Sequence, residues 1–386
     1  MNQDVAIVGV GWEGFSPTSV DYSYKELIYL AANKAYHDAN LDPRRDVESF
    51  ISVAEDFFEG TSIFDEYTPD QLGAVLKPMH TITGEALHGL ISAYLMIRSG
   101  LFNIVAVEAH SKASNIKSIT EVTRYALDPI YQRPLNFHPE FVAGLEMQRF
   151  LYESKCSVAD CSSIVQKNLH NALSNPSAAY AFELSEKELS EADFLAYPLL
   201  ESHIAKPADG AIVIVLASAE VAKQITKQPI WIKGVGWCND SYPLEYRAWD
   251  GLRYVQKAAK MAYNQSHIAN PIVNIDFAEI DDIYAYREAL TLVALGLADE
   301  ATIRGLIREG CFYPEGKFPV NVSGGSLGVG NLFDANGAQK TVEAVLQLRG
   351  IAGARQLNNP RTALVQSWRG IPTTSTAVMV LSNEEK

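Results

Sequence analysis

The stretch VAIVGVGW, residues 5–12, returns in closely similar form as IWIKGVGW at residues 230–237. In both places a β-rich run leads into the tetrapeptide GVGW, which we expect to close a strand and precede a loop. A four-residue identity is weak evidence for an internal repeat by itself. The segments that follow each copy therefore decide whether the chain is duplicated.

The segments after the two copies match in kind and in order. Apolar residues at helical spacing predict amphipathic helices over residues 23–40 and 252–268. Each predicted helix is followed by a polar loop and then by a predicted strand, at residues 46–54 in the first half and 272–280 in the second. The sequence therefore predicts a duplicated helix-and-strand unit.

Each half continues with a second helix and ends in apolar strands. The second helices are predicted at residues 85–99 and 336–349, and the strands at residues 103–110, 210–220, 362–368 and 376–383. Strands that alternate with helices of 10 to 18 residues are typical of an α/β fold with largely buried sheets. The fold class predicted from the pattern is α/β.

Between the halves the pattern changes. Residues 113–205 contain several prolines and irregular spacing, apart from a predicted helix at residues 140–154. We interpret this part as an inserted loop domain that covers one face of the scaffold, where ligand contacts concentrate. The predicted organisation is an N-terminal half of residues 1–112 and 206–228, the insertion at 113–205, and a C-terminal half of residues 229–386.

Composition excludes several classes of protein. The formal net charge is −14, from 32 Lys and Arg against 46 Asp and Glu, which argues against a nucleic-acid partner because phosphate binding needs a concentrated basic surface. The longest apolar stretch, residues 210–219, is about half of the ~20 residues that a membrane span needs. The N-terminus lacks the basic region of a secretory leader, so we expect a cytoplasmic protein without a membrane partner.

The cysteines show no binding or pairing motif. The chain contains no C-x-x-C pair and no histidine pair at zinc-ligand spacing, so neither a disulfide framework nor a metal site is expected. We expect buried free thiols at the four positions. These are Cys156, Cys161, Cys238 and Cys311.

Three longer strings, taken with the duplication, carry a resemblance to a known family. They are NVSGGSLGVGNLFDANGAQKTVEAVLQLRG (321–350), KPADGAIVIVLAS (206–218) and HNALSNPSAAY (170–180). Together they resemble the thiolase superfamily, most closely its sterol-carrier-protein-type and archaeal acetyl-CoA acetyltransferase-like members. The resemblance covers essentially the whole chain and implies a duplicated, five-layered α-β-α-β-α architecture with an inserted loop domain.

The same resemblance implies a site from which the usual catalytic residues are missing. Thiolases use a cysteine at the start of a buried helix, a histidine in a Gly-His-Pro loop and a His-Asp or His-Asn motif. Matching AYLMIRSG (93–100) to the family's helix end places Thr83 at the cysteine. Asp281 stands at the histidine of the family's His-Asp or His-Asn motif. Asn331 follows Gly330 and stands at the histidine of the Gly-His-Pro loop.

The replaced positions suggest altered chemistry. Asp281 and Asp282 are adjacent carboxylates, of which one is expected to act as a base with a raised pKa, although a cap for the following helix is the alternative. Asn331 would keep a hydrogen-bond donor in the oxyanion region. Thr83 is expected to cap the helix that follows it rather than to act as a nucleophile, with Glu85 in its first turn.

Further residues are candidates for substrate binding. Gly324 and Gly325 lie in the N-x-S-G-G loop, where only glycine lets the backbone approach a ligand closely. His138 lies in the insertion, and His88 shares a helix face with Glu85, as an acid–base pair or a helix contact. Tyr284 and Tyr246 are additional polar candidates, although packing is the commoner role of tyrosine.

Three functions follow from the resemblance and its departures. The first is an acyltransferase-type subunit that acts on the C–C bond next to a CoA thioester, in lipid or aromatic acid metabolism, with acyl-CoA as substrate and no covalently bound cofactor. The second is a non-catalytic subunit that binds acyl-CoA or supports a cysteine-bearing thiolase. The third is a cysteine-independent retro-aldolase. The resemblance also implies a homodimer, or a hetero-oligomer with a small OB-fold and zinc-ribbon protein or a second thiolase subunit.

Overall fold

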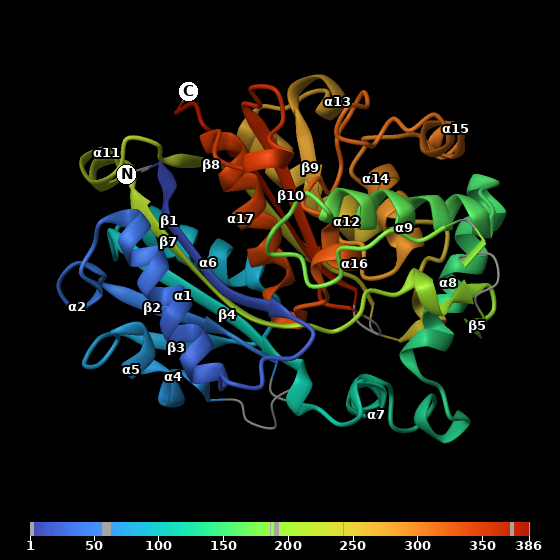
Figure 1. Ribbon diagram of the computed structural model, residues 1–386, viewed down its shortest axis with the longest axis horizontal. Helices are drawn as coiled ribbons and strands as arrows, with labels where there is room; N and C mark the ends of the chain where they lie inside the picture. The colour runs from blue at the N-terminus through green and yellow to red at the C-terminus, as the bar shows by residue number, and fades with distance from the viewer. Residues whose placement is uncertain are drawn as a thin grey trace.

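The protein is a mixed α/β structure built around a large central sheet. The computed structural model describes residues 4–55, 63–185, 187–188, 193–241, 243–370 and 374–385, and Figure 1 shows it as a ribbon. Within these residues, no helix has both the length and the apolar character that crossing a membrane requires.

Among the described residues, nine strands form one hydrogen-bonded sheet. In spatial order the strands are β3 (Met79–Ile82), β2 (Ser49–Val53), β4 (Ile104–Lys112), β7 (Asp209–Ser218), β1 (Val5–Ser16), β8 (Ile230–Asn239), β11 (Ser375–Ser382), β10 (Thr362–Trp368) and β9 (Phe277–Glu279). We call the first five the N-terminal sheet and the last four the C-terminal sheet. Within the described part of the chain, the two sheets join only where Ala6 and Ile7 of β1 pair with Trp231 and Ile230 of β8.

The helices complete a five-layered arrangement, which confirms the expected fold class. Helix α1 (Tyr24–Ala39) covers the outer face of the N-terminal sheet, and α6 (Ala86–Arg98) and α17 (Asn336–Arg349) lie between the two sheets. Helices α12 (Arg253–Ser266) and α14 (Ala285–Ala294) pack into the core on the outer side of the C-terminal sheet. Every residue of α17 is buried, as its central position requires.

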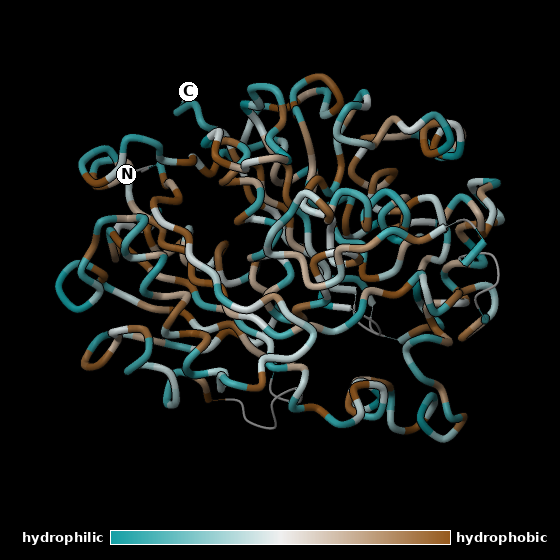
Figure 2. Tube along the Cα trace, viewed as in Figure 1, coloured by the Kyte–Doolittle hydropathy of each residue, from teal (hydrophilic) through white to brown (hydrophobic). Residues whose placement is uncertain are grey.

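The remaining elements are shorter or belong to the covering segment, residues 113–205. That segment contains α7 (Ile119–Thr123), α8 (Pro139–Ser154), α9 (Val158–Ala172) and a small hairpin of β5 (Phe194–Ala196) and β6 (Leu199–Leu200). The other α-helices among the described residues are α2 (Pro43–Asp46), α4 (Phe64–Tyr67), α5 (Pro69–Leu72), α11 (Ala219–Ile225), α13 (Pro271–Asn274), α15 (Ile303–Arg308) and α16 (Gly325–Val329). Hydrophilic residues concentrate on the outer loops, whereas hydrophobic runs follow the strands (Figure 2).

The repeated GVGW explains how each outer helix packs on its sheet. A β-carbon on Gly11 would overlap the backbone carbonyl oxygen of Ala31 in α1, and one on Gly236 would overlap that of Ala258 in α12. In the same way, a β-carbon on Gly9 would overlap the carbonyl oxygen of Ala35, and one on Gly234 would overlap that of Ala262, each one helical turn further along. Because neither glycine carries a side chain, helix backbone and strand backbone come into direct contact in both halves.

A second repeated feature satisfies the backbone between these glycines. The side-chain amide of Gln265 in α12 accepts from Val235 N at 3.2 Å and donates to Val235 O at 2.7 Å. In the first half, Asp38 of α1 accepts from Val10 N at 2.9 Å. Both valines are the second residue of their GVGW copy, so the duplication extends to individual hydrogen bonds.

Three local expectations need correction. GVGW does not close its strands, because β1 continues to Ser16 and β8 to Asn239. The strand expected at residues 272–280 is only Phe277–Glu279, since Pro271 begins the short helix α13 at the position where proline favours a helix start. The covering segment is also more regular than its spacing suggested, because a Ser157 capping box begins the 15-residue helix α9.

Candidate active site

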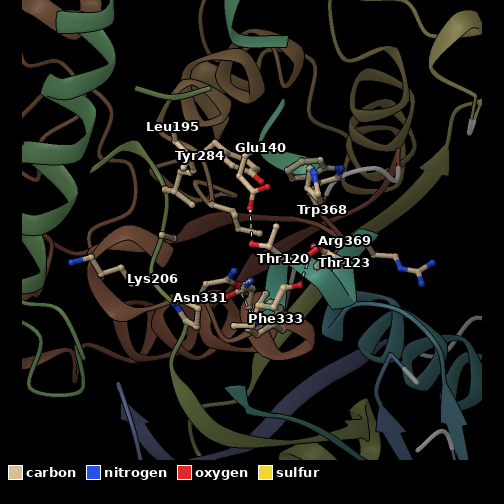
Figure 3. A pocket seen from close by; sticks show the side chains of 18 of the residues that line it. Thr120, Thr123, Glu140, Leu195, Lys206, Tyr284, Asn331, Phe333, Trp368 and Arg369 are labelled. Atoms are coloured by element: carbon tan, nitrogen blue, oxygen red, sulfur yellow. Dashed lines mark hydrogen bonds between the residues drawn. The ribbon is translucent and has the colours of Figure 1, made fainter. Parts of the chain in front are cut away.

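A cavity of about 280 Å³ lies where the covering segment meets the C-terminal half (Figure 3). Helices α7 and α8 form one wall, and residues from the loops after β9, α16 and β10 form the other. Its described lining is Ile119, Thr120, Thr123, Pro139, Glu140, Leu195, Glu201, Ile204, Ala205, Lys206, Pro207, Ile283, Tyr284, Asn331, Phe333, Asn336, Trp368, Arg369 and Gly370. The cavity therefore collects side chains that are distant in the sequence.

Asn331 is held in the cavity wall in a defined orientation. Its backbone N–H donates to Lys206 O at 2.8 Å, and its carbonyl accepts from Ala208 N at 3.0 Å. Its Oδ1 accepts from Phe333 N at 3.0 Å and from Asn336 Nδ2 at 2.7 Å. Because two donors fix Oδ1, Nδ2 is the free end of the amide, and it has no hydrogen-bond acceptor among the described residues.

An aromatic wall is supported from behind by a buried arginine. Tyr284 and Trp368 line the cavity with ring centroids 6.3 Å apart. The guanidinium carbon of Arg287 lies 3.7 Å from the centroid of the Trp368 ring, and Arg287 pairs with Glu146 of α8 at 3.0 Å and donates to Tyr254 Oη at 3.0 Å. These contacts fix the plane of the indole.

Tyr284 is a phenol that keeps its proton. Burial raises the pKa of Tyr284, and the negative charges of Glu140 and Asp281 raise it further. A phenol of this kind can donate a hydrogen bond to a ligand oxygen but does not serve as a base.

Glu140 is the carboxylate at the cavity wall. It is the second residue of α8, and its Oε2 lies 3.0 Å from Nδ1 of His138, the residue before the helix. Its Oε1 accepts from the Thr120 hydroxyl of α7 across a long 3.5 Å. Figure 3 shows Glu140 and Thr120 pointing toward one another, with Asn331 on the other side of Thr120.

Asp281 lies behind the cavity rather than in its described lining. Its side chain is buried, and Oδ2 has no hydrogen-bond partner within the described part of the chain. Burial raises the pKa of Asp281 to about 7, against the opposing positive charges of Arg287 and Lys340. The sequence-based expectation of a raised carboxyl pKa fits this environment, but Asp281 is not part of the described cavity lining.

Asp282 holds the neighbouring loop together. Its carboxylate accepts from Asn168 Nδ2 at 2.8 Å, from Ser326 N at 2.7 Å and from Leu327 N at 3.1 Å, and it pairs with Lys340 at 3.4 Å. The expectation that one of the two aspartates caps the helix after β9 is wrong, because Tyr284 occupies the cap position of α14. Asp282 instead binds backbone N–H groups in the first turn of α16.

The two candidate glycines approach protein rather than the cavity. A β-carbon on Gly325 would overlap the Asp282 carboxylate, and one on Gly324 would crowd Ala172 of α9. Both have positive φ, at 101° for Gly324 and 58° for Gly325, and both are absent from the described cavity lining. Their close approach therefore positions α16.

The start of α6 lies outside the described cavity lining. Thr83 is exposed, and the expectation that it caps the helix is wrong: Glu85 is the cap, and its carboxylate accepts from Leu87 N at 3.0 Å. Glu85 also bonds Gly337 N of α17 and the hydroxyl of Ser367, and burial raises its pKa to about 7. His88 faces Ser375 at 3.2 Å, and burial lowers its pKa to about 4.

The cysteines are all elsewhere. Cys156, Cys161 and Cys311 are buried, Cys238 is partly buried, and none of the four belongs to the described cavity lining. Burial raises the pKa of Cys156 and of Cys161, which opposes thiolate formation. Within the described residues, no group of three or more His, Cys, Asp or Glu side chains is arranged to hold a metal ion.

The structure thus brings Asn331 together with residues that the sequence did not single out. Glu140 and Trp368 were not among the candidates, and Tyr284 was only a secondary one. The sequence signal for Glu140 was the run HPE at the start of a predicted helix, which places a carboxylate beside a histidine. Nothing in the sequence alone indicated that this helix end meets the loop of Asn331.

Comparisons with known proteins relate this chain to thiolase-like proteins. A family model described as "Thiolase C-terminal domain-like" matches residues 244–383. An acetyl-CoA acetyltransferase of Methanothermobacter thermautotrophicus is 23% identical over 98% of this chain and 100% of its own length.

Two solved structures have the same fold over the whole chain. One, named "Ltp2-ChsH2(DUF35) aldolase", has a TM-score of 0.85 at 21% identity and is covered to 99%. A monomeric SCP2-thiolase like protein type 1 from Mycobacterium smegmatis has a TM-score of 0.72 at 17% identity and is covered to 78%. At these identities the likeness concerns the fold.

Proposed function

We propose that this chain, which belongs to the thiolase superfamily, makes or breaks the C–C bond next to a CoA thioester by an aldol reaction, without a covalent acyl-enzyme. The substrate class is a 3-hydroxyacyl-CoA. One observation carries the proposal: the cavity combines Asn331, Tyr284 and Glu140, and none of the four cysteines belongs to its described lining.

The reaction places two demands on the site. A base must take the proton of the 3-hydroxyl group, and a donor must stabilise the enolate oxygen that develops on the thioester as the C–C bond breaks. The free Nδ2 of Asn331 and the protonated phenol of Tyr284 supply the donors. No nucleophile is required.

Acyl transfer, the first function expected from the sequence, makes a demand that this cavity does not meet. A thiolase reaction passes through an acyl group carried on a nucleophile, which must be activated by a neighbouring base. Thr83 is exposed outside the described lining, and no cysteine replaces it there. The aldol reaction therefore ranks above acyl transfer.

The chain would act within a complex. We place it in the cytoplasm, as a homodimer or as one subunit beside a small OB-fold and zinc-ribbon protein or a second thiolase subunit. One fold neighbour is named for two components, Ltp2 and ChsH2(DUF35), which supports an assembly of this kind.

A non-catalytic, acyl-CoA-binding subunit is the second candidate. The observation that favours it is Asp282, whose carboxylate at the expected base position is fully occupied in holding α16. A binding subunit would retain affinity for acyl-CoA and show no turnover.

The experiment compares the wild type with a variant in which all four cysteines are replaced by alanine. Each is purified with any co-expressed partner and incubated with 3-hydroxyacyl-CoA and 3-ketoacyl-CoA thioesters, and products are identified by mass spectrometry. We expect 3-hydroxyacyl-CoA to be split into a shorter acyl-CoA and an aldehyde or ketone by both proteins. Loss of cleavage in a folded cysteine-free variant would contradict the proposal, and binding without turnover in both would support the non-catalytic subunit.

A further inference from the structure

We propose that Glu140 is the general base of this site and that His138 is a positioning residue that orients its carboxylate. The inference rests on the proposed aldol function and assigns the proton-transfer step within it. It moves the base from the aspartates after β9 to the first turn of α8, in the covering segment.

The geometry leaves one oxygen of Glu140 available to a ligand. Oε2 is held by His138 Nδ1 at 3.0 Å, whereas Oε1 has, among the residues that the structure describes, only the long 3.5 Å contact from Thr120. A substrate hydroxyl can displace such a long contact, because catalytic hydrogen bonds often shorten only when substrate is bound. Glu140 therefore combines a fixed orientation with an open acceptor position.

The other carboxylates near the cavity are less suited to this step. Asp282 accepts three hydrogen bonds and an ion pair from α9, α16 and α17. Asp281 is 1% exposed and lies outside the described lining. Neither presents an oxygen to the described cavity, whereas Glu140 lines it directly.

The surroundings of Glu140 match the task of a base. The charge of Glu140 acts on Tyr284, so the two groups share one electrostatic environment. Figure 3 shows Glu140 and Asn331 on opposite sides of the cavity, so that a bound thioester can meet a base at one end and a donor at the other.

The proposed step balances without an outside reactant. Glu140 Oε1 takes the proton of the 3-hydroxyl group, and the O–H electron pair forms the carbonyl at C3. The C2–C3 bond breaks, and its electron pair becomes the thioester enolate held by Asn331 and Tyr284. The enolate carbon then takes a proton from protonated Glu140, which gives the shorter acyl-CoA and restores the carboxylate.

The test uses full-length protein with any co-purified partner. Glu140→Gln removes the basic oxygen with little change in shape, and Glu140→Ala opens space for formate added to the buffer. Glu153→Gln is the matched control, because Glu153 lies on the same helix in a surface ion pair with Arg149. For the positioning role, His138→Asn keeps a donor near the place of Nδ1 and His138→Ala does not.

We expect Glu140→Gln to lower kcat about 10²- to 10⁴-fold with KM little changed, as loss of a general base does. Formate should restore turnover to Glu140→Ala, an effect that a purely structural role would not produce. His138→Ala should lower kcat about tenfold, and His138→Asn should recover most of it. Glu153→Gln should match the wild type.

Three results would overturn the assignment, and they can be told apart. If the wild type cleaves 3-hydroxyacyl-CoA and Glu140→Gln does so at a similar rate, Glu140 is not the base although the proposed function stands. If the wild type binds these thioesters and cleaves none, the proposed function is wrong, and so is the assignment of Glu140 as its general base. A folded Glu140→Ala variant that formate does not rescue also contradicts the assignment.

Discussion

Gln265 pairs with both backbone groups of Val235, in the place where a neighbouring strand would otherwise bond β8. Asp38 has the corresponding position in the first half, where it accepts from Val10 N. Strand edges leave N–H and C=O groups unpaired, and side chains from the adjoining helix satisfy them here. The same backbone position of the GVGW motif is thus hydrogen-bonded by a helix side chain in both halves, by Asp38 in the first and by Gln265 in the second.

Replacing Gln265 with alanine should lower the free energy of unfolding by about 1 kcal/mol, because Val235 loses two hydrogen-bond partners at a partly solvated edge. Urea unfolding followed by circular dichroism measures the change. Gln256→Ala is the control, since Gln256 is an exposed glutamine on the same helix. Equal stability of the two variants would show that the pairing with Val235 contributes nothing.

Replacing Gly236 with alanine should destabilise the fold by about 3 kcal/mol, as overpacking does, because the new methyl group overlaps the carbonyl of Ala258. Gly305→Ala is the matched control. Gly305 lies in α15 with open space around it, so the same change there should be neutral or stabilising by about 0.5 to 1 kcal/mol. Thermal unfolding of both variants checks the contrast, which equal melting temperatures would contradict.

Stability should depend on pH through Asp281. The pKa of this carboxyl rises from 3.8 to about 7 in the folded protein, so the folded state holds the proton more tightly. The contribution of protonated Asp281 to the free energy of unfolding is complete below about pH 4 and is lost as the pH rises through 7. Over that range the free energy of unfolding falls by up to about 1.4 kcal/mol per pH unit. Asp281→Asn should flatten this part of the stability profile, measured by urea unfolding between pH 4 and 8.

The control for that profile is Asp299→Asn, which changes an exposed carboxylate. It should leave the slope unchanged. A slope that is the same in the wild type and in Asp281→Asn would show that Asp281 is not a source of the dependence.

Asn331→Asp separates the two ends of the amide. Aspartate keeps an acceptor for Phe333 N and Asn336 Nδ2 but removes the free donor, so the loop should survive while the enolate oxygen loses its partner. We expect kcat to fall about 10²- to 10³-fold, as for loss of one oxyanion donor. Initial rates with a 3-hydroxyacyl-CoA measure the effect, and an unchanged melting temperature shows that the fold is intact. Unaltered kcat would exclude Asn331 from the reaction.

The sequence predicted the scaffold well because its signals are local. Each of these signals can be recognised within about 20 residues: the GVGW copies, the alanine-rich outer helices and the apolar strands. The errors occurred where one residue overrides a pattern. Pro271 turned the start of an expected strand into helix α13, and Glu85 rather than Thr83 capped α6.

The site was harder to predict because its parts meet only in three dimensions. The resemblance identified Asn331, which lines the cavity. It also identified Asp282 and Gly325, which lie against one another where the loop after β9 contacts the start of α16. The two roles look alike in sequence, since a buried acid beside a glycine turn can hold a ligand or a loop. Glu140 was missed because a family comparison directs attention to the positions that the family uses.

The backbone contacts at the two GVGW copies have a consequence for motion. With no side chain at these glycines, the backbones of α1 and β1, and those of α12 and β8, lie in direct contact, so a lateral shift of either helix would disturb close packing. We expect the proposed CoA thioester to enter beside α7 and the first turn of α8, which line the cavity. The Thr120 and Glu140 contact, which joins these two pieces, would be the first to separate when the substrate arrives.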